Sequence, residues 1–485
     1  MLMLSQQQKL VLSEYSALYD IVVPQDNLLR RINGLVDFSF VYQELLDKYC
    51  PDNGRMAESP IRMFKYLLLK VIYDISDADV VDRSRYDMSF KYFLGMAPEA
   101  EVINPSSLSK FRKLRLKDMD LLNLLIKKTV DIAIEKGVIK SRTIIVDATH
   151  TGSRSNPYSP IEILRLRSKQ LRKAIYNADE DIKETLPKKN EDDLVKELDY
   201  TKELIDIVSG NAGIAEVPAV KQRINMLKET LEDIEDHYTT SKDEDARLGH
   251  KSEDSSFFGY KTHIAMSDER IITAAVVTSG EKGDGPQLES LVEQSRNNGM
   301  EVDTVIGDTA YSGVENLRLA EDEKNGFELI SRLNPVISNG NRKEEDKFDF
   351  NKDAGMFVCP AGHMAIRKAK QGKKDGRCNQ VWTYYFDTDK CKACSHREGC
   401  YKEGSKTKTY SVSIKTGEQE RLMEFQKTPE FKAKARQRYK IEAKNAELKH
   451  VYGYDRAESY GLYSMQMQGA ITIFAANIKR ILKLI

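Results

Sequence analysis

Two short apolar runs rich in β-branched residues each end in an aspartate. Residues 143–147 read Thr-Ile-Ile-Val-Asp and residues 304–308 read Thr-Val-Ile-Gly-Asp, a composition typical of buried strands. A third acid, Glu442, lies in a basic stretch of helical character, 438–449. Two carboxylates at strand ends and one on a helix can converge on a pair of divalent ions. That arrangement is one known solution for breaking and joining phosphodiester bonds.

Magnesium suits such a site because it is a hard cation that prefers oxygen ligands and is usually held by a few carboxylates together with substrate phosphates. The pattern therefore makes Asp147, Asp308 and Glu442 candidate ligands of two Mg²⁺ (or Mn²⁺) ions.

Charge is unevenly distributed along the chain. Lys+Arg and Asp+Glu balance at 75 each, but residues 401–485 carry 17 Lys and Arg against 9 Asp and Glu, a net charge of +8. Acidic residues predominate between 179 and 245. A basic C-terminal region in a neutral chain indicates one segment that faces nucleic acid.

No stretch of 18 uninterrupted apolar residues occurs, so no membrane span and no membrane partner are expected. The N-terminus turns polar at Ser5, unlike a signal peptide. We expect a cytoplasmic protein.

The periodicity of apolar residues divides the chain into parts. Residues 1–140 are predicted to form an all-α domain, with apolar positions at helical spacing in 62–73 and 121–133. Strands are predicted at 143–147, 257–265, 271–278, 304–307 and 327–331, with a helix at 286–296. The fold class is therefore α/β. If the first and fourth strands are adjacent, Asp147 and Asp308 come together.

Two long insertions interrupt this α/β core. We expect the core at 141–159, 245–340 and 425–485, a helical hairpin at 160–244, and a Cys-rich insertion at 341–424.

The geometry of a helix at 438–449 supports the choice of the third acid. At about 100° per residue, Arg438, Glu442 and Lys449 share one face, whereas Glu447 falls on the opposite side. Cations beside a metal-binding carboxylate can hold phosphate oxygens. The alternative is a surface helix with ordinary i,i+4 ion pairs.

Four motifs together resemble those of bacterial insertion-sequence transposases of the DDE superfamily. They are Ile144-Ile-Val-Asp-Ala-Thr-His150, Phe258-Gly-Tyr-Lys-Thr-His263, Gly307-Asp-Thr-Ala-Tyr311, and Arg438-x3-Glu442-x6-Lys449. Residues 51–112 also resemble the N-terminal helical domain of that family. One departure is Ala435, where the family often has a tyrosine.

This resemblance implies a ribonuclease-H-like core, with a mixed five-stranded sheet, and an enzyme that cuts and joins double-stranded DNA. It implies phosphate contacts from Arg438, Lys449 and Tyr311, and the contact of the missing tyrosine would have to come from Tyr439. Synapsis of two element ends in a bacterial nucleoid implies a homo-oligomer, at least a dimer.

Five of the six cysteines crowd between 359 and 400. Cys359, followed by Cys391-x2-Cys394-x5-Cys400, offers four thiolates for a tetrahedral Zn²⁺, and the resemblance also points to a zinc-ribbon-like insertion. Unliganded buried cysteines are the alternative. Cys378 is expected to be a core residue, and Trp382 to pack rather than to stack on a base.

Further residues and functions stay open from the sequence. Asp284 can lie at the edge of the acidic site, and His263 is expected to be a core residue rather than a base. A metal-dependent endonuclease without strand transfer and a catalytically dead, transposase-derived DNA-binding protein are the alternative functions.

Overall fold

The computed structural model describes residues 2–3, 13–50, 54–155, 158–179, 181–188, 194–235, 241–252, 255–324, 326–334, 337, 348–351, 353–372 and 380–485. Cys378 lies outside these residues. None of the described helices is long and apolar enough to cross a membrane.

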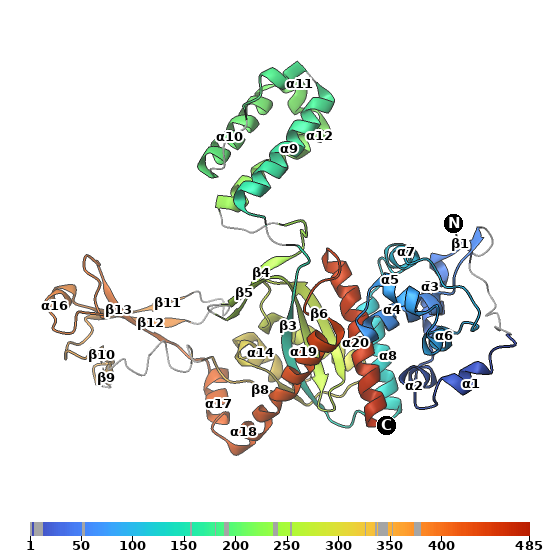
Figure 1. Ribbon diagram of the computed structural model, residues 1–485. Helices are drawn as coiled ribbons and strands as arrows, with labels where there is room; N and C mark the ends of the chain where they lie inside the picture. The colour runs from blue at the N-terminus through green and yellow to red at the C-terminus, as the bar shows by residue number, and fades with distance from the viewer. Residues whose placement is uncertain are drawn as a thin grey trace.

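The N-terminal part is helical, as its periodicity predicts (Figure 1). Local signals set the helix ends: Ser76 and Asp79 form a capping box, and Pro60 starts its helix in the first turn, where no N–H is needed. The pair β1 (Leu2–Met3) and β2 (Arg55–Met56) is parallel. The helices are α1 (Leu18–Val22), α2 (Leu28–Leu35), α3 (Ser39–Leu45), α4 (Pro60–Tyr73), α5 (Asp77–Arg83), α6 (Met88–Leu94), α7 (Ser106–Leu114) and α8 (Leu121–Glu135), with a 3₁₀ turn η1 (Leu46–Lys48).

A mixed sheet forms the centre of the molecule, with the order β4-β5-β3-β7-β8 and β6 also paired with β5. The five predicted strands are confirmed, and β4 is a sixth that the sequence did not indicate. It pairs with the first part of β5, a strand that is longer than predicted. The strands are β3 (Thr143–Gly152), β4 (Arg247–Ser252), β5 (Ser255–Ser267), β6 (Ile272–Ser279), β7 (Thr304–Ile306) and β8 (Glu328–Ile330).

Strand β3 is central because it pairs antiparallel with β5 and parallel with β7. The first and fourth of the predicted strands are therefore adjacent, which is the condition for Asp147 and Asp308 to come together. A 3₁₀ turn and a helix follow each of β6 and β7. They are η3 (Gly285–Gln287) and α13 (Leu288–Asn297) after β6, and η4 (Thr309–Tyr311) and α14 (Val314–Ala320) after β7.

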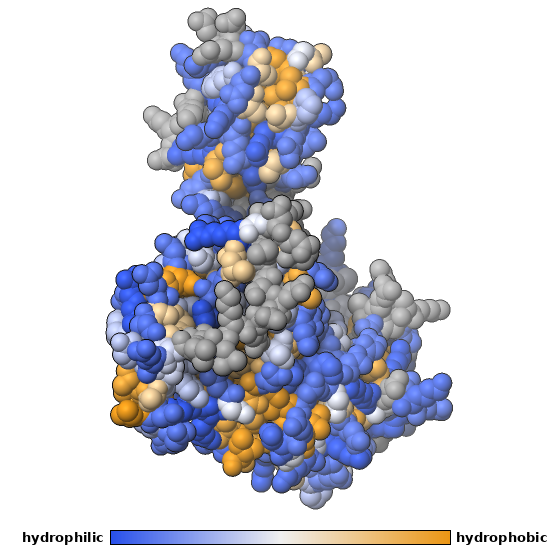
Figure 2. Space-filling view, turned by 90° about the vertical axis from the view of Figure 1, so that its right-hand side faces the viewer, coloured by the Kyte–Doolittle hydropathy of each residue, from blue (hydrophilic) through white to orange (hydrophobic). Residues whose placement is uncertain are grey.

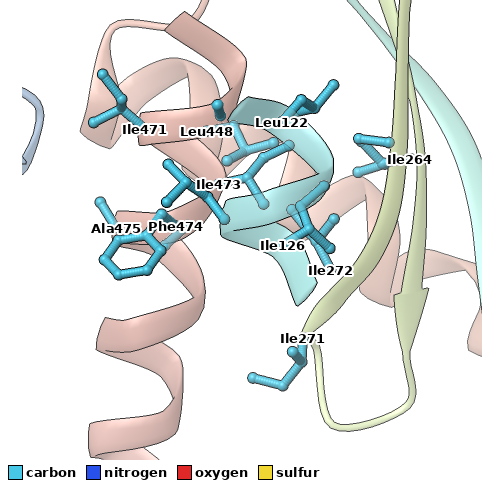
Figure 3. Packing of buried hydrophobic residues seen from close by; sticks show 14 of the residues in the cluster. Leu122, Ile126, Ile264, Ile271, Ile272, Leu448, Ile471, Ile473, Phe474 and Ala475 are labelled. Carbon is cyan, nitrogen blue, oxygen red and sulfur yellow. The ribbon is translucent and has the colours of Figure 1, made fainter. Parts of the chain in front are cut away.

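The C-terminal segment packs on the sheet through a long helix, α20 (Leu462–Leu484). Figure 3 shows Ile473 of α20 on the side that faces Ile126 of α8, with Ile272 of β6 next to Ile126, whereas Phe474 points to the opposite side of α20. One continuous cluster of buried residues extends from the N-terminal helices through α8 to the sheet. The helices before residue 140 thus share a core with the sheet. The other helices of this segment are α17 (Gly417–Phe425), α18 (Pro429–Ala435), η5 (Arg436–Arg438) and α19 (Tyr439–Tyr452).

The first insertion is a helical bundle that stands away from the main body (Figures 1 and 2). It has its own buried core, which includes Leu171, Leu204 and Leu227. The predicted hairpin of two helices is wrong, since a third long helix, the basic and amphipathic α9, packs against both of the others. The bundle contains α9 (Pro160–Ala178), η2 (Asp181–Glu184), α10 (Leu194–Gly210), α11 (Ala212–Ala215) and α12 (Pro218–Glu235).

The Cys-rich insertion is built from short strands around a third, small core. Phe357, Tyr384 and Tyr410 pack there with ring centroids about 5 Å apart. Trp382 is half-buried against this core, as its predicted packing role requires. The elements are β9 (Asp349–Asn351), β10 (Met356–Val358), β11 (Arg367–Gln371), β12 (Val381–Phe386), α16 (Thr388–Lys392) and β13 (Lys408–Ser413).

Candidate active site

The parallel register of β3 and β7 brings the two aspartates level with each other. Ile145 is paired with Ile306, so two residues further along each chain Asp147 stands beside Asp308. The sequence predicted that Asp147 ends its strand. This prediction is wrong, because β3 continues alongside β5 as far as Gly152. Only the pairing with β7 stops before the aspartates.

Local structure fixes Asp308. Its carboxylate accepts a hydrogen bond from the backbone N–H of Ala310 at 2.9 Å, which caps the turn η4. The preceding Gly307 is required by close packing, since a Cβ there would meet the ring of Tyr311 at 2.7 Å. The Gly-Asp-Thr-Ala-Tyr motif therefore folds as a tight cap around the carboxylate.

The electrostatics of the two aspartates reflect their closeness. Burial raises the pKa of Asp147 to about 6, and the negative charges of Asp308 and Asp284 contribute to the rise. Burial likewise raises the pKa of Asp308, with Asp284 again contributing, while Arg438 and Lys261 oppose the shift. Two half-buried acids that resist ionisation together form a site that attracts cations.

Helix α19 lies over this acidic pair. The side-chain amide of Asn445 donates to Asp147 Oδ2 at 3.0 Å. Asn445 is three residues after Glu442, and at about 100° per residue it shares the face of Glu442 and Lys449. Sequence analysis missed Asn445, although its spacing from Glu442 was available as a signal.

Glu442 itself is exposed and forms an ion pair with Arg438 one turn earlier. Among the described residues, no three Asp, Glu, His or Cys side chains are grouped closely enough to hold one metal ion. The geometry brings Asp147 and Asp308 together, with Asp284 nearby. Glu442 lies on the same face of α19 as Asn445, but its carboxylate is paired with Arg438.

The residues predicted to contact phosphate differ in how accessible they are to a ligand. Lys449 Nζ lies 3.3 Å from His150 Nε2, and Tyr439 is 64% exposed at the start of α19. Tyr311, in contrast, is fully buried. The described structure gives its hydroxyl no hydrogen-bond partner, and the surrounding aspartates raise its pKa beyond the effect of burial. Its burial argues against the predicted DNA contact.

The four cysteines of the insertion line a single cavity of about 390 Å³. All four are free thiols. Burial raises the pKa of the Cys391 thiol, and the neighbouring Cys400, Cys359 and Cys394 thiols add to the shift. Two turns present the thiols: Gly362 N–H donates to the carbonyl of Cys359, and Cys394 N–H to that of Cys391.

Two carboxylates on adjacent strands, together with a further acid on a later helix, are an arrangement typical of enzymes that use divalent metal ions on phosphodiester bonds. Comparison with known families agrees. Residues 17–114 match a family described as Transposase domain (DUF772), and residues 217–478, more than half of the chain, match the Transposase DDE domain family. The chain belongs to the DDE transposase family and is a DDE-type transposase enzyme, with the ribonuclease-H-like core that this domain implies.

No curated protein matches the chain in sequence. Among solved structures, it matches a piggyBac transposase synaptic complex with hairpin DNA, with 8% identity over 94% of this chain and 78% of that chain. The TM-score is 0.29, too low to bear on the fold or the site.

Proposed function

We propose that this transposase binds the terminal inverted repeats of its own insertion sequence, cuts the DNA at them and joins the ends to a target. The observation that carries the proposal is the register of β3 and β7, which sets Asp147 beside Asp308 beneath the helix that contains Glu442. Family membership supports the same chemistry.

In this proposal Asp147, Asp308 and Glu442 hold two Mg²⁺ or Mn²⁺ ions. The residues fit such ions: burial raises the pKa of both aspartates, and Asn445 Oδ1 is a buried acceptor without a donor in the described structure. When bound, the ions activate water or a DNA 3′-OH and stabilise the leaving 3′ oxygen. Glu442 would join the two aspartates as a ligand once its ion pair with Arg438 opens, and this would free Arg438.

Protein side chains then bind and orient the DNA. The cations Arg438 and Lys449 hold phosphate oxygens beside the acids, with Tyr439 exposed at the start of the same helix. Asn445 donates to Asp147 Oδ2 and so orients that carboxylate. No covalent intermediate with the protein is required, because the attacking oxygen displaces the 3′ oxygen directly at phosphorus.

Two further parts belong to the proposal. Cys359, Cys391, Cys394 and Cys400 bind a structural Zn²⁺, supported by their shared cavity. A homodimer forms at synapsis, and the N-terminal helices read the repeat. The exposed lysines of α7, Lys110 and Lys113, are suited to contact its phosphates.

The test is a cleavage and joining assay on labelled DNA that carries the element's own ends, in Mg²⁺ and in EDTA. We expect metal-dependent nicks at the repeat boundary and joined products, with both lost in Asp308→Asn and retained in the exposed control Glu424→Gln. Nicks without joining would favour an endonuclease. Binding without cleavage in either Mg²⁺ or Mn²⁺ would favour a DNA-binding protein that has lost its chemistry.

A further inference from the structure

Lys261 is a half-buried cation beside the acidic site. It lies on β5 in the Phe258–His263 motif, and its side chain is only 15% exposed. In the β3–β5 ladder it is directly opposite His150, three residues after Asp147. A lysine seldom occupies such a position without a partner, because burying its charge is costly.

Two acceptors hold its ammonium group. Lys261 Nζ lies 3.0 Å from Asp284 Oδ1 and 3.1 Å from the carbonyl oxygen of Lys282. An ammonium carries three N–H donors. The third has no acceptor among the described residues, so one donor of a fixed cation is available to a ligand.

Asp284, the partner of Lys261, lies against a buried histidine. Its Oδ1 also lies 3.5 Å from Nδ1 of His263. His263 is fully buried, and its other ring nitrogen is 3.0 Å from Thr278 Oγ1. The predicted core position of His263 is confirmed, and its ring lies against Asp284, although its Nδ1 makes no hydrogen bond within the described structure.

The segment that carries Asp284 packs against the cap of Asp308. The amide of Asn316 donates to the carbonyls of both Gly285 and Tyr311, at 3.0 and 3.1 Å. The fit is close, since a Cβ on Gly285 would meet the carbonyl oxygen of Ala310 at 2.7 Å. The positive charge of Lys261 lowers the pKa of Asp308 against the effect of burial. The ammonium is therefore within electrostatic reach of the catalytic carboxylate.

We propose that Lys261 is a substrate-binding residue whose free N–H donates to a non-bridging oxygen of the scissile DNA phosphate. It approaches from β5, while Arg438 and Lys449 approach from α19. The inference rests on the proposed function, and it assigns the Lys261–Asp284 pair to phosphate recognition rather than to stability alone. Asp284 is the positioning residue that keeps the ammonium directed at the site.

The test measures DNA binding by the full-length protein with Ca²⁺ in place of Mg²⁺, with intact DNA verified on a gel. Two end DNAs are compared, one unmodified and one with a neutral methylphosphonate at the scissile position. Lys261→Met should weaken binding of the unmodified DNA by roughly 10–100-fold, the range for a hydrogen bond to a charged group. On the methylphosphonate DNA the same substitution should have no effect, because the charged oxygen that it contacts is already absent.

Two further variants complete the experiment. Lys261→Arg keeps the charge and a donor and should restore most of the binding. Lys221→Met removes an exposed cation of α12, paired with Glu216, and should leave both affinities unchanged. Equal losses on both DNAs, or no loss on either, would overturn the assignment of Lys261. Failure of the wild-type protein to cut its ends in Mg²⁺ would instead overturn the proposed function itself.

Discussion

The side-chain amide of Asn445 donates a hydrogen bond of 3.0 Å to the carboxylate of Asp147. This contact joins α19, the helix of Glu442, to the central strand of the sheet. Residues that hold a metal ligand in this way are often as necessary as the ligand itself.

Asn445→Ala should therefore reduce metal-dependent cleavage by about 10–100-fold, the usual cost of losing a contact to a metal ligand. The loss should be smaller at high Mn²⁺ concentration, because the carboxylate is misoriented rather than removed. Cleavage rates across a Mn²⁺ titration check this, with the exposed Asn297→Ala as the matched control. A rate reduced by the same factor at every Mn²⁺ concentration would contradict a role through the metal.

The raised pKa of Asp147 predicts how the stability of the metal-free protein depends on pH. The carboxyl has an ordinary pKa of 3.8 and a folded pKa of about 6. Between these values the folded protein binds more protons than the unfolded chain, so stability falls as pH rises from about 4 to 6. Above that window the penalty is complete, at most about 3 kcal/mol.

Asp147→Asn removes this ionisation and should stabilise the metal-free protein above pH 6, while changing little at pH 4. Urea unfolding in EDTA across pH 4–8 measures the difference. The exposed Asp206→Asn on α10 provides the control and should leave the pH profile unchanged. An Asp147→Asn protein less stable than wild type at pH 7 would be evidence against the burial of an uncompensated charge.

Zinc removal should unfold the Cys-rich insertion and spare the main core, because the two have separate buried clusters. We expect about one zinc per chain by elemental analysis, lost in Cys391→Ser, with new protease cleavage confined to residues 341–424. Ser substitution at Cys50, a free cysteine of the N-terminal part, is the control. Well under one zinc per wild-type chain would remove the basis for this ion.

Phe474 joins the N-terminal helices to α20. It is fully buried, with ring centroids 5.8 Å from Phe64 and 6.5 Å from both Phe38 and Phe40. Phe474→Ala should cost about 3–5 kcal/mol of unfolding free energy. Leu484→Ala, at the exposed end of the same helix, should cost less than about 0.5 kcal/mol. If the two substitutions have equal effects in urea unfolding, the N-terminal helices do not share the core of the sheet.

The sequence predicted the strands of the sheet, because buried strands have a strong compositional signal. It predicted that Asp147 and Asp308 come together only on the condition that the first and fourth strands are adjacent. It did not indicate β4, whose segment Arg247–Ser252 is polar and pairs only at the sheet edge. It also missed the contacts of Asn445 and Lys261, which depend on how α19 and the loop at Asp284 pack over the strands. Tyr311 was predicted to contact DNA from its motif, whereas its ring fills the space beside Gly307.

The central claim is that Asp147, Asp308 and Glu442 surround the same metal ions. Iron-mediated cleavage tests it directly: Fe²⁺ replaces Mg²⁺, ascorbate and peroxide generate hydroxyl radicals at the bound ion, and mass spectrometry locates the breaks in the protein backbone. We predict breaks next to residues 147, 308 and 442 that Mg²⁺ suppresses. Breaks near 147, 308 and 284 with none near 442 would contradict the account, because Asp284 and not Glu442 would then be the third acid at the metal.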